Sequence, residues 1–232
     1  MYILHSNDIN DLSALDTAEL IDQLDHAVTT TEAVTLIQAL TAKRTQTAIA
    51  PLMQMLHHHH RAVSTAAIEG LVQLAPDSVG PLITAFGTSK DHGVQASIVQ
   101  ALAWIGDARA LDLLIEVIGV EVANHCQGNV RRVAARGLGK IGRMSDVSTM
   151  SRAVEKLTWA LFHATDWALR YSAVVSLEEI ATTEAIAVLK QALLQESDLV
   201  VQERLKTALE EGNLEEVTGN SSWIESPSGI KV

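Results

Sequence analysis

The segment VRRVAARGLGKIG, Val130–Gly142, decides the fold because related segments recur along the chain. In each copy a leucine stands eight positions after the first apolar residue, a leucine or isoleucine follows three positions later, and a Gly or Ala closes the segment. Apolar residues at i, i+4, i+8 and i+11 form one face of an α-helix. The other copies are VSTAAIEGLVQLA (Val63–Ala75), VQASIVQALAWIG (Val94–Gly106) and LRYSAVVSLEEIA (Leu169–Ala181). The residue before the leucine is always small, which predicts close helix packing.

A second, shorter apolar stretch follows each of these segments, for example DARALDLLIEVI and TEAIAVLKQALL. A truncated fifth copy, VQERLKTAL, spans Val201–Leu209, and successive copies start 31, 36, 39 and 32 residues apart. This spacing is shorter than the roughly 40–47 residues of an ordinary HEAT repeat. The sequence therefore predicts an all-α fold: an α-solenoid of about five compact HEAT-like helical-hairpin repeats.

The two ends differ from the repeats. Residues 1–30 are predicted to be an N-terminal capping region with one acidic helix, Leu12–Val28, and residues 31–211 form the solenoid. Residues 212–232 are rich in Ser, Gly and Asn, which predicts a flexible C-terminal tail. Trp223 and Ile224 in this tail could alternatively dock on a partner.

Composition narrows the class of protein. The chain has 232 residues, with Lys+Arg 17 against Asp+Glu 28 and a formal net charge of −11, which argues against a general nucleic-acid binder. A single cysteine excludes an intramolecular disulfide framework and suits a reducing compartment. We see no secretory signal and no run of about 18 apolar residues that would span a membrane. The expected location is the cytoplasm.

The connection before Val130 is irregular and contains NHCQGN, Asn124–Asn129, with the only cysteine of the chain. Asn129 is the expected N-cap of the next helix. Cys126 would then lie just before a helix N-terminus, where the partial positive charge lowers the pKa of a thiol. His125 could carry or take a proton near neutral pH. Two other readings are an inert, buried cysteine and a zinc site, although one Cys and one His are too few ligands for zinc.

Basic residues follow this motif without an acidic one between them. They are Arg131, Arg132, Arg136, Lys140 and Arg143. The spacing of the last four places them on one helix face, where they could bind carboxylates or simply face solvent.

Two further segments are candidates for function. In FHATDWALRY, Asp166 is a potential helix cap, and Trp167 and Tyr171 lie four apart on one face, where they could stack on a flat ligand or pack locally. The histidine run His57–His60 is expected in a solvated turn between two repeat helices, because adjacent residues rarely converge on one metal ion.

The repeats together with DWALRYSAVVSL and GVEVANHCQGNVRRVAARGLGKIG resemble the F subunits of the E/F-type phycobilin lyases of cyanobacteria, from about Thr31 to Gly212. NHCQGN is similar to the motif of the isomerising members, which act on the phycoerythrocyanin α-subunit. The resemblance implies an E–F heterodimer that attaches phycocyanobilin to a cysteine of the apo α-subunit and isomerises it to phycoviolobilin.

The resemblance also assigns roles to residues. His125 and Cys126 would be catalytic in the isomerisation, with phycocyanobilin as substrate and no metal or other tightly bound cofactor. The candidate substrate-binding residues are Asn124, Gln127, Asn129, Arg131, Arg132, Arg136, Asp166, Trp167 and Tyr171. In this account the basic residues would bind the bilin propionates and Asp166 the pyrrole N–H groups. Two alternatives are a non-isomerising phycocyanin α-subunit lyase subunit and a non-catalytic HEAT-like scaffold or chaperone that binds phycobiliproteins.

Overall fold

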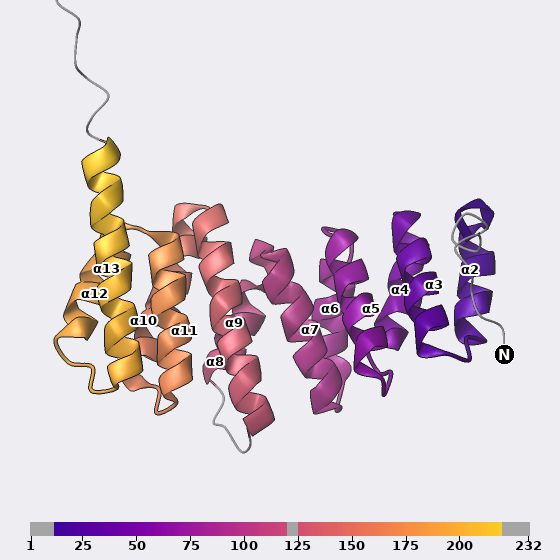
Figure 1. Ribbon diagram of the computed structural model, residues 1–232, viewed down its shortest axis with the longest axis horizontal. Coiled ribbons are helices and arrows are strands. Elements are labelled where there is room, and N and C mark those ends of the chain that lie inside the picture. The colour runs from indigo at the N-terminus through magenta and orange to yellow at the C-terminus, as the bar shows by residue number, and fades with distance from the viewer. Residues whose placement is uncertain (1–11, 120–124, 220–232) are drawn as a thin grey trace, which may run out of the picture.

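The chain is built from helical hairpins stacked side by side (Figure 1). The computed structural model describes residues 12–119 and 125–219, and for 125–127 and 211–219 only the backbone. The α-helices are α2 (Thr17–Asp25), α3 (Thr30–Ala42), α4 (Ile49–Met55), α5 (Arg61–Gln73), α6 (Val79–Thr88), α7 (His92–Ile105), α8 (Leu111–Gly119), α9 (His125–Met144), α10 (Val147–His163), α11 (Trp167–Ile180), α12 (Thr183–Leu193) and α13 (Leu199–Gly219). The described residues contain no β-strand, and the predicted all-α solenoid is confirmed.

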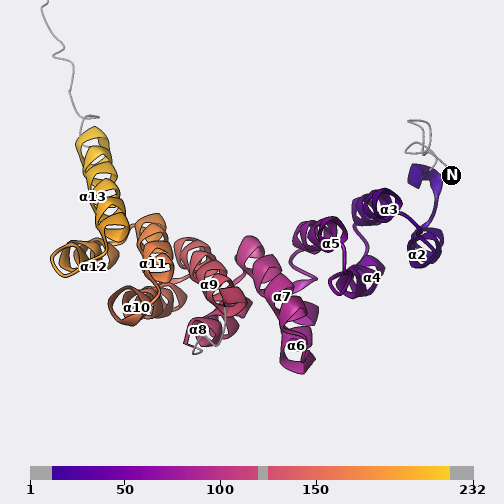
Figure 2. The same cartoon turned by 60° about the horizontal axis from the view of Figure 1, so that its bottom comes forward.

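The helices form two curved layers (Figure 2). Helices α3, α5, α7, α9, α11 and α13 line the concave side, and we call them the inner helices; α4, α6, α8, α10 and α12 form the convex side and are the outer helices. The five segments identified from the sequence are all inner helices. Turns that lead from an outer to an inner helix lie along one edge, at the bottom of Figure 1, which we call the lower edge. Turns from inner to outer helices form the upper edge.

The core is aliphatic and lies between the two layers. The leucine at the eighth position after each start is fully buried, at 0% exposure, in all four full copies: Leu71, Leu102, Leu138 and Leu177. The small residue before it allows the close approach that the sequence predicts. A Cβ atom on Gly137 of α9 would lie 2.7 Å from Ala103 Cβ and 2.8 Å from Leu114 Cδ1.

Substitution Gly137→Ala is therefore expected to destabilise the protein by about 3 kcal/mol, because the added methyl group would also lie 2.8 Å from the backbone Cα of Ala103 and force α7 and α9 apart. Gly80→Ala in α6 is the matched control, since a Cβ atom there meets nothing within 4 Å. This control should be neutral or stabilising by up to about 1 kcal/mol. Urea unfolding followed by circular dichroism measures both changes, and equal stabilities would contradict the packing argument.

The ends differ in detail from the expectation. The single helix predicted over Leu12–Val28 is wrong, because Asp16 interrupts it and caps α2. The Glu19 N–H donates to Asp16 Oδ1 at 2.9 Å, while Glu19 Oε2 accepts from the Asp16 N–H at 2.8 Å. Helix α13 continues to Gly219, so the predicted start of the tail at residue 212 falls inside a helix. Trp223 and Ile224 lie outside the described residues. Over the described ranges, no helix is long and apolar enough to cross a membrane.

Candidate functional site

Helix α9 is longer than its neighbours and begins earlier. It has 20 residues, whereas α7 and α11 have 14 each. The caps of those two helices, Asp91 and Asp166, stand three residues before the first apolar anchor. The corresponding position before Val130 is residue 127, yet α9 already begins at residue 125. One extra helical turn, residues 125–127, therefore extends α9 by about 4.5 Å at the lower edge.

This extra turn, which we call the leading turn, contains His125 and Cys126. The expected N-cap role of Asn129 is wrong, because Asn129 is the fifth residue of the helix. The preference of Asn for N-caps is a local tendency, and α9 begins four residues earlier even though Gly128 disfavours a helix interior. Cys126 is the second residue of α9, so the electrostatic argument for a helix N-terminus still applies to it. Asn124 lies outside the described residues, and the roles of His125, Cys126 and Gln127 stay predictions.

A groove on the concave side runs along α9 between α7 and α11. Its volume is about 520 Å³, and its lining combines cations, a carboxylate and one tryptophan. The residues that line it include Ala103, Trp104, Arg132, Val133, Arg136, Gly137, Lys140, Ser172 and Glu179. The predicted cationic face of α9 thus lies in a concave site.

The cations of the groove have partners within the chain. Arg132 forms a two-pronged ion pair with Asp166, with Nε 2.8 Å from Oδ2 and Nη2 3.0 Å from Oδ1. Arg136 and Arg143 share Glu179, at 3.6 and 3.5 Å. Lys140 donates to the carbonyl oxygen of Trp104 at the end of α7. Arg143 does not line the groove but extends the same cationic face of α9. The four cations of this face are balanced by two carboxylates, Asp166 and Glu179, which leaves an excess of two positive charges along the groove and its end.

Asp166 stabilises the local structure in two ways. It caps α11 by accepting the Ala168 N–H at 3.1 Å, which confirms the predicted cap, and it orients Arg132. Burial raises the pKa of Asp166, but the hydrogen bonds from Arg132 and Ala168 outweigh that effect and hold the pKa below its usual value. The predicted contact between Asp166 and pyrrole N–H groups stays a prediction.

Asp166→Asn is expected to lower the stability by about 1 kcal/mol at pH 7, because the pair with Arg132 is partly exposed to solvent. The folded-state pKa of Asp166 is depressed, so its contribution is present above the unfolded-state value of about 4 and is lost as the pH falls through the folded-state pKa. Urea unfolding between pH 3 and 7 should show that the free energies of unfolding of the two proteins become equal only at the acid end of this range. A difference independent of pH would contradict the assignment.

Three other residues predicted to bind the substrate are not among those that line the groove. Arg131 points to the outer layer, where its Nε donates to the carbonyl oxygen of Ile118 at 2.9 Å, so it is not part of the groove. Trp167 is 48% exposed at the start of α11. Tyr171 is half-buried and packs against the core, which favours local packing for this residue.

Trp104 is a groove residue that the sequence analysis did not identify. Its side chain is 42% exposed and lies opposite the cations of α9. An alignment of the repeat segments would have identified it. Trp104, Lys140 and Glu179 each stand ten positions after the start of their segments. Equivalent positions of neighbouring inner helices lie side by side in a solenoid.

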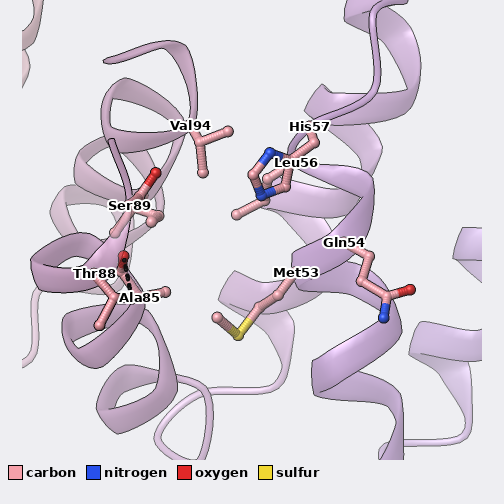
Figure 3. A pocket seen from close by; sticks show the side chains of 9 residues that line it. Met53, Gln54, Leu56, His57, Ala85, Thr88, Ser89 and Val94 are labelled. Atoms are coloured by element: carbon pink, nitrogen blue, oxygen red, sulfur yellow. Dashed lines mark hydrogen bonds between the residues drawn. The ribbon is translucent and has the colours of Figure 1, made fainter. Parts of the chain in front are cut away.

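The histidine run lies in the turn between α4 and α5, as predicted. His60 caps α5 by accepting the Ala62 N–H at 3.3 Å. His57 borders an apolar pocket of about 340 Å³, where its ring faces Val94 across the opening (Figure 3). Among the described residues, no group of three or more His, Cys, Asp or Glu side chains could hold a metal ion.

Comparison with known proteins defines the class. A family described as PBS lyase HEAT-like repeat matches residues 94–119, and one described as HEAT repeats matches residues 120–210. The chain is 28% identical to a chain in the solved complex of CpcE and CpcF of phycocyanin lyase from Nostoc sp. PCC7120, with a TM-score of 0.62, covering 71% of this chain and 99% of that one. These matches place the chain among the HEAT-like proteins of the bilin lyase type.

Two similar proteins narrow the assignment. The bilin biosynthesis protein PecF of Mastigocladus laminosus is 56% identical over 201 residues, covering 84% of this chain and 95% of the relative. The PecF protein of Nostoc sp. PCC 7120 is 55% identical over 163 residues, covering 70% and 94%. The chain belongs to the PecF family of bilin biosynthesis proteins.

Proposed function

We propose that this chain is the F subunit of a heterodimeric bilin lyase-isomerase. With an E-type partner it attaches phycocyanobilin to a cysteine of the apo phycoerythrocyanin α-subunit and isomerises the pigment to phycoviolobilin. One observation carries the proposal: the same helix, α9, begins with His125 and Cys126 and also forms the cationic wall of the concave groove. The identity to PecF proteins supports the isomerising type, and the solved CpcE–CpcF complex supports the heterodimer.

The groove has the properties that a bilin requires. Phycocyanobilin is a linear tetrapyrrole with two propionates, and the excess of two positive charges matches them. A guanidinium binds a carboxylate through two parallel hydrogen bonds, and Arg136, with 45% of its side chain exposed, is available for this contact. Trp104 offers an aromatic face to a flat ligand. The groove volume lies within the range of about 300–1,000 Å³ found for small-molecule sites.

The chemistry requires a proton transfer. Isomerisation moves a double bond from the bridge between rings A and B into ring A, so one carbon loses a proton and another gains one. His125 shuttles this proton. Cys126 has one of two roles. It adds transiently to the conjugated bilin, forming a C–S bond that breaks again after the proton has moved, or it acts as a second proton donor and acceptor of the site. The step needs no oxidant or reductant, and a reducing cytoplasm would keep the thiol available.

Omission of single components tests the proposal. This chain, an E-type subunit, phycocyanobilin and the apo α-subunit are combined, and covalently bound bilin is detected by zinc-enhanced fluorescence on a denaturing gel. We expect an adduct only when both lyase subunits are present. An undiminished adduct in the absence of this chain would reject the catalytic role and leave the scaffold alternative.

A further inference from the structure

The last two repeats expose apolar side chains at the lower edge. Leu194 at the end of α12 is 86% exposed, and Leu199 and Val200 at the start of α13 are 78% and 52% exposed. We call these three residues the terminal edge patch. Trp167, the first residue of the neighbouring helix α11, is 48% exposed, and α11 begins at the same edge. Clustered exposed apolar side chains mark interaction surfaces more often than isolated ones do.

A buried ion pair holds this part of the edge in place. Arg170 Nε lies 2.8 Å from Glu196 Oε2, and the two side chains are only 15% and 6% exposed. Arg170 also donates to the carbonyl oxygen of Ala164 at 2.9 Å, and Glu196 accepts the Asp198 N–H at 2.9 Å. The pair therefore ties the turn before α11 to the turn before α13. A surface that is already ordered loses little entropy when a partner binds.

A hollow of about 240 Å³ lies beside the patch between the ends of α10 and α12. Its lining includes Phe162 and Ala192 but also Gln195 and the paired Arg170 and Glu196, so the hollow is largely polar. Exposed leucines next to a polar hollow are typical of a protein interface, in which apolar side chains form the centre and polar groups the rim.

The terminal edge patch lies on the lower edge, as does the leading turn that carries the proposed catalytic residues. The leading turn of α9 extends at this lower edge, and the Arg132–Asp166 pair joins α9 to the residue before Trp167. Under the proposed function, the ring A chemistry takes place at this turn, so a protein that receives the bilin from it has to approach the same edge.

We propose that the terminal edge patch docks the apo acceptor α-subunit in its pigment-free form; this inference rests on the proposed function. Pigment pockets are largely apolar, so an acceptor without its bilin exposes apolar surface that the attached pigment later covers. The patch binds that surface before attachment, and affinity falls once the pocket is filled. The weaker binding of the pigmented acceptor then allows the product to dissociate.

A matched pair of substitutions tests the surface. Leu199 and Val147 are both the first residue of a helix, both follow an aspartate cap, and both are exposed, at 78% and 76%, but Val147 lies at the upper edge. An aspartate in the first helical turn is favourable, so both Leu199→Asp and Val147→Asp should fold normally, which circular dichroism checks. The affinity of the complex with the E subunit for the apo acceptor is measured by fluorescence anisotropy, without bilin.

We expect Leu199→Asp to raise the Kd for the apo acceptor about tenfold and Val147→Asp to leave it unchanged. The wild-type complex should bind the apo acceptor at least about tenfold more tightly than the pigmented one. An unchanged Kd for Leu199→Asp, or equal binding of both acceptor forms, would overturn the proposal. Loss of E-subunit binding in Leu199→Asp would overturn it as well, by assigning the patch to that subunit. Once phycocyanobilin is added to the same mixture, normal acceptor binding without any covalent adduct would reject the proposed function and leave this docking surface intact.

Discussion

Replacement of Cys126 by serine is expected to slow isomerisation at least about 100-fold, so that the acceptor α-subunit carries phycocyanobilin in place of phycoviolobilin. A serine hydroxyl is not ionised near neutral pH and is a poor nucleophile, whereas a thiol in the first turn of a helix is readily deprotonated. Single-turnover kinetics of the bound pigment measure the effect. Attachment itself is the internal control, because the acceptor thiol belongs to the other protein and the yield of adduct should not change.

His125→Gln separates the two roles of the leading turn. If His125 shuttles the proton, this variant should lose isomerisation as Cys126→Ser does, and added imidazole should restore part of the rate. A phycoviolobilin product formed at the wild-type rate by Cys126→Ser would reject the role of the thiol.

Arg136→Gln is expected to weaken the binding of free phycocyanobilin about tenfold, because it removes one of the two excess positive charges of the groove. Glutamine keeps most of the side-chain length and avoids placing a new carboxylate beside Glu179. The Kd is measured by absorbance titration at low and high salt, and the effect should shrink as salt increases.

Arg152→Gln is the matched control for this charge change. Arg152 lies on the outer helix α10, pairs with Asp112 and has a half-exposed side chain, as Arg136 does. An equal loss of affinity in both variants would show that net charge, and not the groove, determines bilin binding.

The repeat helices could be predicted because their information is local and periodic. One apolar anchor every third or fourth residue fixes the buried face, and the small residue at Gly137 fixes how closely α7 approaches. The start of α9 could not be predicted in this way. Its leading turn contains no apolar anchor, so the spacing of apolar residues gives no information about where the helix begins. The capping tendency of Asn129 indicated a later start.

The candidate site could be predicted only in part. The spacing of Arg132, Arg136 and Lys140 identified a common face, but their partners come from α7 and α11, which are distant in sequence. Arg131, next to them in the sequence, points instead to the end of α8. Trp104 was missed because it is meaningful only when neighbouring repeats are aligned position by position.

The absorbance of the acceptor α-subunit after acid–urea denaturation distinguishes a lyase-isomerase from a lyase that only attaches the pigment. Denaturation removes the influence of the protein on the pigment, so the spectrum reports the chemistry of the bound bilin alone. After incubation with this chain, an E-type subunit and phycocyanobilin, we expect a blue-shifted spectrum typical of phycoviolobilin. An unshifted phycocyanobilin adduct would contradict this expectation and reduce the chain to a subunit of a non-isomerising lyase.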